Sequence, residues 1–207
     1  MKKIMVIAAA LLMGISASAQ HAGIVAGFTS SQLNISEAKI TSAAGYQLGF
    51  AYNYPLGAGF AIQPELLYDV KASTVEALKN SNSAAEVGAL AKMGYVEIPL
   101  QVQWGLNLMV VRPYVFAEPF VGCAVSGFLK DEDGKTKITF DNFSDRLEYG
   151  LGIGAGVEIF SKLQISAKYY WNLDQNDSFD SLVNNVSNNI KTERGFDGLV
   201  ISAAIFF

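Results

Sequence analysis

Few residues of this chain have the type and spacing that catalysis requires. An enzyme needs an activated nucleophile or a positioned acid and base. His21 is the only histidine among the 207 residues, and it lies near the start of the chain. The many carboxylates alternate with apolar residues, which is typical of neutralised structural charges rather than of a catalytic pair. The sequence predicts no catalytic residue and no enzyme activity.

A series of glycines at a strict spacing of two could suggest a loop that binds a dinucleotide: Gly150, Gly152, Gly154 and Gly156. Such a loop leads from a strand into an amphipathic helix, but no amphipathic helix follows these glycines. Glycines at alternate positions of a strand mark a close approach of neighbouring groups. We therefore predict close packing inside a narrow barrel and no bound cofactor.

Charge and cysteine content exclude two kinds of protein. The formal net charge is −4, and it becomes −6 when Lys2 and Lys3 leave with the signal described below. The basic surface of a nucleic-acid-binding protein is therefore absent. Cys123 is the only cysteine, so no disulfide can form within one chain.

The first residues have the pattern of a secretory signal. Met1-Lys2-Lys3 is basic, residues 4–15 are apolar, and Ala17-Ser18-Ala19 supplies small residues for cleavage. The apolar run is shorter than the roughly 20 residues that a membrane-spanning helix needs. We predict removal of residues 1–19, with cleavage before Gln20, leaving one domain over residues 20–207.

Most of the remaining chain alternates between apolar residues and small or polar ones. In one such run, Tyr46, Leu48 and Phe50 share one parity, while Gln47 and Gly49 occupy the other. This alternation predicts strands with one apolar face and one polar face. Past the signal, no stretch approaches the roughly 18 apolar residues of a membrane helix. The alternation predicts eight strands, over residues 23–30, 45–54, 60–71, 95–104, 112–125, 147–159, 163–173 and 195–207.

The spacing of these runs predicts their topology. Short connections at 55–59, 105–110 and 160–162 alternate with long ones at 31–42, 72–93, 126–145 and 174–194. Short periplasmic turns and long extracellular loops are typical of bacterial outer-membrane barrels. We predict an all-β, eight-stranded antiparallel up-and-down transmembrane β-barrel with both termini in the periplasm.

One long connection contains the acidic run Asp131-Glu132-Asp133-Gly134, which could be taken for a calcium loop. The glycine is misplaced for an EF-hand. Asp133-Gly134 is typical of a type I′ turn, so we predict a hairpin here and no metal site. Divalent cations that bridge loop acids to lipopolysaccharide remain an alternative.

Charged residues also occur on the face that should point into the barrel. Eight strands enclose a lumen about wide enough to be filled by side chains. We predict internal ion pairs and no wide pore, formed by a structural charge network of Glu65, Glu97, Glu118, Arg146, Glu148, Glu158 and Lys168.

The opposite face carries aromatic residues at the levels expected for the two membrane interfaces, which amphipathic rings favour. Tyr54, Phe60, Trp104 and Phe207 should lie near the periplasmic rim. The outer rim should hold Tyr46, Tyr68, Tyr149, Tyr169 and Trp171.

Several short motifs resemble the PorT-like outer-membrane β-barrel domain family. Residues 95–100 (YVEIPL) are similar to its fourth-strand signature, and residues 112–115 (RPYV) with Gly122 are similar to its fifth. Glu118 stands where members often have glycine, which implies a more crowded lumen. The alternating C-terminal residues resemble the signal read by the barrel-insertion machinery: Leu199, Ile201, Ala203, Ile205 and Phe207.

The resemblance implies a fold and a bacterial outer-membrane location rather than an activity. The leading hypothesis is a monomeric, non-enzymatic barrel among outer-membrane lipid and lipopolysaccharide, with extracellular loops that contact an unknown surface partner or support envelope integrity. Two alternatives remain open. One is a narrow or gated conduit for small solutes. The other is a soluble periplasmic lipocalin-like carrier, which would need its aromatic faces turned inward.

Overall fold

Where the structure describes this protein, its backbone is almost entirely extended. The structure, a computed structural model, describes residues 21–35, 39–77, 87–131, 134–137, 146–173 and 192–207. In these ranges no helix is long and apolar enough to cross a membrane. The strands are β1 (Ala22–Ile35), β2 (Lys39–Tyr52), β3 (Tyr54–Gly57), β4 (Phe60–Ala77), β5 (Val87–Gly105), β6 (Val111–Asp131), β7 (Gly134–Lys137), β8 (Leu147–Ile159), β9 (Leu163–Asn172) and β10 (Thr192–Phe206).

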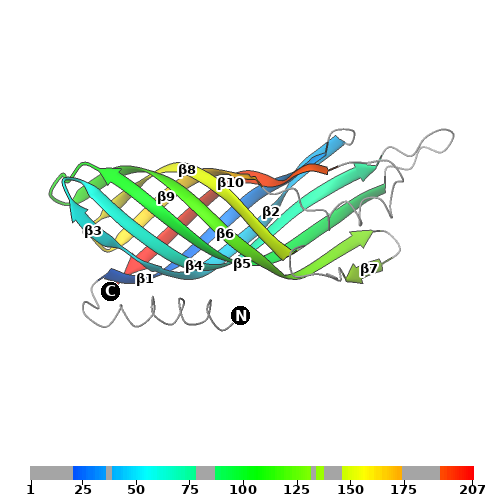
Figure 1. Cartoon of the computed structure of the whole chain (residues 1–207), viewed down its shortest axis with the longest axis horizontal. Coiled ribbons are helices and arrows are strands. Elements are labelled where there is room, and N and C mark those ends of the chain that lie inside the picture. Colours follow the sequence, from blue (N-terminus) through cyan, green and yellow to red (C-terminus); the bar gives the residue numbers. More distant parts are fainter. Residues whose placement is uncertain (1–20, 36–38, 78–86, 132–133, 138–145, 174–191) are drawn as a thin grey trace.

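Eight of these strands form a closed ring, and Figure 1 shows the resulting barrel from the side. Each pairs antiparallel with its neighbour in the order β1, β2, β4, β5, β6, β8, β9, β10, and β10 pairs back to β1. The two short strands are additions, because β3 pairs with β4 and β7 with β6. The predicted eight-stranded up-and-down barrel is therefore confirmed.

The exposure of side chains follows the predicted parity. Leu48 and Phe50 are 55% and 66% exposed, whereas Gln47 is 3% exposed. Glu65 and Glu97 are also buried. The soluble carrier hypothesis is therefore wrong, because it requires these polar side chains outside. Val70 shares the parity of exposed Tyr68, which predicts the outer face, but it is buried.

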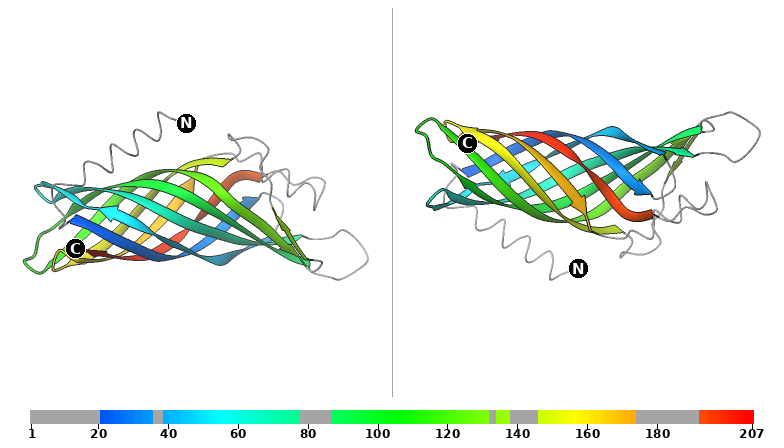
Figure 2. Two further views of the ribbon diagram at one scale, coloured as in Figure 1. Left: turned by 90° about the horizontal axis from the view of Figure 1, so that it is seen from below. Right: turned by 90° about the horizontal axis from the view of Figure 1, so that it is seen from above.

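At one end of the barrel, called here the far end, the strands are longer than predicted. β1 continues to Ile35 and β2 begins at Lys39, while β4 continues to Ala77 and β5 begins at Val87. The connections predicted at 31–42 and 72–93 are therefore shorter than expected. Backbone pairing continues where the alternation of apolar and polar residues has faded. Both views of Figure 2 show strands of unequal length at this end.

The predicted acidic hairpin is confirmed as the β6–β7 pair, in which Asp131 pairs with Gly134. The predicted position of its turn is wrong by one residue, because the two residues between these partners are 132 and 133. Those two positions lie outside the described residues. Most of the connection at 174–194 also lies outside them.

The opposite end, called here the turn end, carries the short connections. The start of β1 and the C-terminus also lie there (Figure 1). Phe207 donates its backbone N–H to the carbonyl oxygen of Ala22 at 2.9 Å, and Asn53 donates to His21 at the same distance. The backbone at the start of β1 and at the C-terminus is therefore anchored at this end of the ring.

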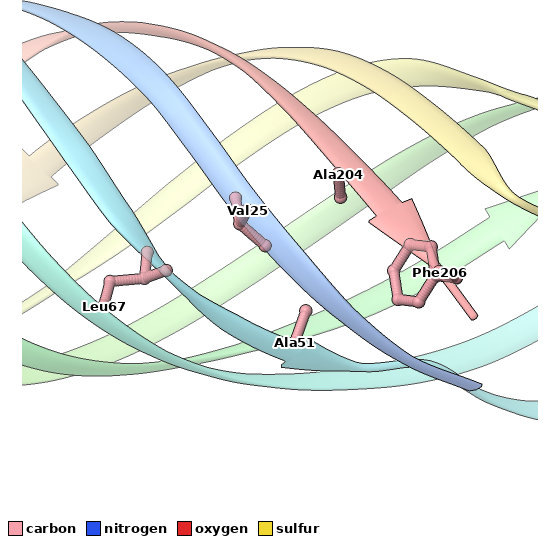
Figure 3. Packing of buried hydrophobic residues seen from close by; sticks show 5 residues of the cluster. All are labelled: Val25, Ala51, Leu67, Ala204 and Phe206. Atoms are coloured by element: carbon pink, nitrogen blue, oxygen red, sulfur yellow. The ribbon is translucent and has the colours of Figure 1, made fainter. Parts of the chain in front are cut away.

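Part of the lumen is filled by apolar side chains from four strands. The buried cluster in Figure 3 takes one or two residues from each of β1, β2, β4 and β10. Its largest member is the ring of Phe206, close to the turn end. The cluster consists of Val25, Ala51, Leu67, Ala204 and Phe206.

The glycines of β8 make room for aromatic rings of β6. Gly154 pairs with Phe116, and a Cβ added to Gly154 would lie 2.5 Å from Cζ of that ring and 2.4 Å from the carbonyl oxygen of Ala167. Gly150 is equally close to Phe120. The prediction of close packing inside the barrel is confirmed at these positions.

We expect Gly154→Ala to lower the free energy of unfolding by about 1–3 kcal/mol, the usual cost of overpacking. Gly152→Ala is the matched control, because the atom nearest to its added Cβ lies 3.6 Å away. Urea unfolding of the barrel in lipid vesicles measures both. Equal losses at the two glycines would contradict ring packing as the cause.

Candidate functional site

The polar side chains inside the barrel form three groups along its length. We call them the turn-end network, the central pair and the far-end network. Each draws on strands that are not neighbours in the ring, so each crosses part of the lumen. Strand alternation places most of these side chains inside, because they share the parity opposite to the apolar outer face. Asp197 is an exception, since it is buried although it shares the parity of exposed Leu199.

The turn-end network is organised by Arg112 at the start of β6. Its guanidinium donates to Oε1 of Gln103 at 3.1 Å and to the carbonyl oxygen of Gly59 at 3.0 Å. Glu158 Oε2 lies 3.6 Å from Arg112 Nη1 and accepts a 2.8 Å hydrogen bond from Gln164. These contacts tie β5, β8 and the turn before β4 to one cationic group, and Gln164 adds β9 through Glu158.

Side-chain amides continue this network towards the middle of the barrel. Asn53 donates to Gln63 at 2.9 Å, and Gln103 donates to both Gln63 and Gln101, at 3.1 and 3.0 Å. Gln63 and Gln101 in turn donate to Oε1 of Glu65, at 2.8 and 3.0 Å. The carboxylate therefore ends a chain of amide donors, which satisfies polar groups that would be costly to bury alone.

The central pair joins two strands on either side of β8. Lys168 on β9 donates to Oε1 of Glu118 on β6. Glu118 is fully buried and Lys168 is 8% exposed. A buried charge needs such a partner because desolvation costs several kcal/mol per ion.

The far-end network surrounds Lys71 of β4. Its Nζ lies 2.7 Å from Oε1 of Glu97 and 2.8 Å from Oε1 of Glu148. The rings of Tyr95, Phe120 and Tyr170 have their centroids 4.8 to 5.0 Å from the same nitrogen. The ammonium thus has two carboxylate partners and three cation–π contacts, supplied by strands β5, β6, β8 and β9.

Further hydrogen bonds hold this network in place. Asn172 donates its side-chain amide to Oε2 of Glu148 at 2.7 Å, and its backbone N–H to Asp197 at 3.1 Å. Thr29 donates to Asp69 at 3.3 Å. Together these bonds connect β1, β4, β8, β9 and β10 at the far end.

The structure places the predicted lumen residues as follows. Glu65, Glu97, Glu118, Glu148 and Lys168 are buried inside the barrel, and Glu158 is partly buried at the turn end. Arg146 is partly buried just before β8.

Four further charged residues belong to the networks but were absent from the predicted set: Lys71, Asp69, Arg112 and Asp197. Asp197 shares the parity of exposed Leu199, so alternation would have placed it outside. Lys71 and Asp69 share the parity of Glu65, and this signal could have identified them. Arg112 begins a strand, where parity is least informative.

The aromatic residues predicted for the membrane interfaces lie on the outer face. All are exposed except Trp171, which is partly covered and whose ring centroid lies 5.0 Å from that of Tyr169. The exposed ones are Tyr46, Tyr54, Phe60, Tyr68, Trp104, Tyr149 and Tyr169. The alternating C-terminal residues Leu199, Ile201, Ala203, Ile205 and Phe207 are exposed as well.

The arrangement of these groups suits structural support better than chemistry. His21 lies at the turn end, and its ring packs edge-on to Tyr52 with centroids 6.3 Å apart. Within the described ranges, no group of three His, Cys, Asp or Glu residues could hold a metal ion. A hollow of about 300 Å³ opens at the turn end, where Arg112 and Glu158 contribute to its lining. The contacts of the turn-end network lie next to this hollow.

Among the comparisons with known proteins, a family model identifies the type of barrel. The chain matches the family model described as outer membrane protein beta-barrel domain over residues 17–179. No curated protein matches it in sequence.

Solved structures of similar barrels include the Neisserial surface protein A (NspA), at 13% identity and a TM-score of 0.45, over 90% of this chain and 97% of that one. The attachment invasion locus protein Ail of Yersinia pestis has 12% identity and a TM-score of 0.45, over 91% and 99%. The N-terminal β-barrel domain of Pseudomonas aeruginosa OprF has 11% identity and a TM-score of 0.36, over 92% and 100%. The family model covers well over half of the sequence, and this chain therefore belongs to the outer membrane protein beta-barrel domain family.

Proposed function

We propose that this outer-membrane barrel acts as a non-enzymatic surface protein, through contacts made at its far end. In this proposal residues 1–19 are removed after export, and residues 20–207 insert as a monomer with both termini in the periplasm. The PorT-like resemblance is a narrower assignment than the matched family and remains a prediction. Lipopolysaccharide and outer-membrane lipid surround the barrel, and the far end faces outward.

The observation that carries the proposal is the continuation of the sheet beyond the apolar outer face. β4 and β5 remain paired from Lys71 and Met93 to Ala77 and Val87, past the last lipid-facing aromatic of β4, Tyr68. β6 continues to Asp131 and adds β7 through four residue pairs. Among the described strands β7 pairs with β6 alone. The other edge of β7 therefore offers backbone donors and acceptors to an added strand.

The lumen supports this role over that of a conduit. Contacts between strands that are not neighbours cross it at Lys168–Glu118 and at Lys71–Glu148. At the turn end Arg112 of β6 reaches past β5 to the carbonyl oxygen of Gly59, just before β4. Residues lining an open channel would instead be expected to leave a continuous water-filled path, as in larger barrels. We therefore expect no open-channel current in planar-bilayer recordings of the purified barrel.

The orientation is tested with single cysteines in a Cys123→Ser background. Thr136→Cys in β7 should react with a membrane-impermeant maleimide on intact cells. Lys162→Cys in the β8–β9 turn should react only after the outer membrane is permeabilised. The reverse pattern would overturn the outward far end.

The contact role is tested with a photo-cross-linkable residue at Thr136 in intact cells. The expected result is an adduct with another envelope or surface component, which the same residue at lipid-facing Leu100 does not give. Planar-bilayer recordings of the purified barrel complete the test. Discrete current steps together with no adduct at Thr136 would favour the conduit.

A further inference from the structure

The turn end presents a ring of exposed apolar side chains that the barrel itself does not cover. We call this ring the turn cap and define it by Leu56, Leu106, Leu108, Met109 and Phe160. These side chains are 54%, 54%, 59%, 106% and 71% exposed, respectively. The three turns at 54–59, 105–110 and 160–162 contain one charged residue, Lys162. An apolar surface of this kind marks an interaction site.

The backbone conformation at the tips of these turns is unfavourable for the residues that occupy them. Ala58, Met109 and Phe160 have φ values of 51°, 53° and 54°, and Ser161 has 56°. This left-handed region is the usual place for glycine or asparagine. In the turn closed by the hydrogen bond from Lys162 N–H to the carbonyl oxygen of Ile159, both central residues, Phe160 and Ser161, have positive φ. A bulky aromatic such as Phe160 is an unfavourable choice there. A local cost of this kind persists where a contact offsets it, and the described part of the chain supplies no cover for Phe160.

The turn cap continues the apolar outer face without a break. Leu56 follows Tyr54 on the same parity, and Leu106 follows Trp104. A strand tilted by about 40° rises about 2.6 Å per residue along the barrel axis. From Tyr46, the apolar face is then about 21 Å tall if it ends at Tyr54, and about 26 Å tall if Leu56 is included.

The same calculation on β5 gives the same pair of heights. Val96 begins the exposed apolar series of β5, and this series is about 21 Å tall to Trp104 and about 26 Å tall to Leu106. The apolar band of outer-membrane barrels is about 25 Å tall. On β2 and β5 the band therefore reaches this height only when the turn residues are counted in it.

The distribution of the turn cap also indicates what covers it. The three turns join β2 to β4, β5 to β6 and β8 to β9, so they are spread around the ring. Phe207, 62% exposed, occupies the remaining position beside β1. A protein partner would contact a patch on one side of the barrel, whereas a lipid layer contacts the whole circumference.

We propose that the turn cap is inserted in the membrane, at the boundary between acyl chains and headgroups of the leaflet nearest the termini. Lys162 then lies at the level of the lipid phosphates, where its stem contacts apolar groups and its ammonium reaches the anionic surface. The turns are thus part of the lipid-facing surface of the barrel rather than connections in water. This placement does not depend on which function the far end performs.

The proposal is tested by the accessibility of a spin label in vesicles of phosphatidylethanolamine and phosphatidylglycerol. Met109→Cys and Phe160→Cys are made separately in the Cys123→Ser background and labelled. Each label should collide several-fold more often with oxygen, which concentrates in lipid, than with a water-soluble nickel complex. Leu100→Cys is the lipid-facing reference, and Thr136→Cys in β7 is the reference in water. Retarded gel migration of boiled relative to unboiled samples confirms that each variant is folded.

A nickel collision rate at both turn positions equal to that at Thr136→Cys would overturn the proposal, since the turn cap would then lie in water. The measurement is repeated at a tenfold lower protein-to-lipid ratio. Nickel access that rises on dilution would also overturn it, because a second copy of the chain would then be the cover. Unchanged protection at both ratios supports lipid insertion.

Discussion

Replacing Lys71 with Met is expected to lower the free energy of unfolding of the barrel by about 3–5 kcal/mol. The lysine nitrogen lies within 2.8 Å of oxygens from both Glu97 and Glu148, and both carboxylates are buried. Methionine fills similar space but leaves two buried carboxylates close together without their cation. Urea unfolding in lipid vesicles, followed by tryptophan fluorescence, measures the loss.

Two variants separate this effect from a general loss of charge or volume. Lys92→Met removes a lysine from β5 that is partly exposed, and it should change stability by no more than about 0.5 kcal/mol. Glu97→Gln leaves Lys71 paired with Glu148 and should cost much less than Lys71→Met. If Lys71→Met were as stable as Lys92→Met, the far-end network would not contribute to stability.

The closed barrel could be predicted because one simple pattern determines it. Alternation places Gln47 inside and Leu48 outside, and a polar lumen beneath an apolar face is stable only when the sheet closes in lipid. The same parity correctly placed Glu97 and Glu148 inside. It failed at Val70, which is buried close to where the β2–β4 register shifts between Ser42 and Tyr46.

The partners inside the lumen could not be predicted from the same pattern. Lys71 lies opposite Met93 in the β4–β5 ladder, yet its ammonium reaches Glu97, four residues further along β5. Its second partner, Glu148, belongs to a strand that is not adjacent. Such contacts depend on the stagger of all the strands around the ring, which the sequence of any single strand does not contain.

The length of the strands at the far end could not be predicted, for a different reason. β4 was expected to end near Lys71 but continues to Ala77. Beyond the apolar outer face the two sides of the sheet do not need to differ in polarity, so the strand continues without the alternating pattern. Backbone hydrogen bonds continue the pairing there. Hydrophobic periodicity therefore reports the height of the lipid-facing band rather than the length of the strands.

The central pair offers a test in which stability is first lost and then restored. Lys168→Met should lower the free energy of unfolding by about 3–5 kcal/mol, because the fully buried Glu118 would lose its partner. Glu118→Leu alone should have a similar cost, because it strands the ammonium. The double variant should recover most of the loss, since two apolar groups of similar size need no partner.

This recovery distinguishes an ion pair from ordinary packing. Two independent packing defects would add, whereas partners in one interaction give a coupling energy of the same order as each single loss. Lys71→Met combined with Lys168→Met is the matched control, because the two lysines belong to separate networks and their losses should add. A double variant Lys168→Met with Glu118→Leu that is as unstable as the sum of its parts would show that the pair does not stabilise the lumen through its charges.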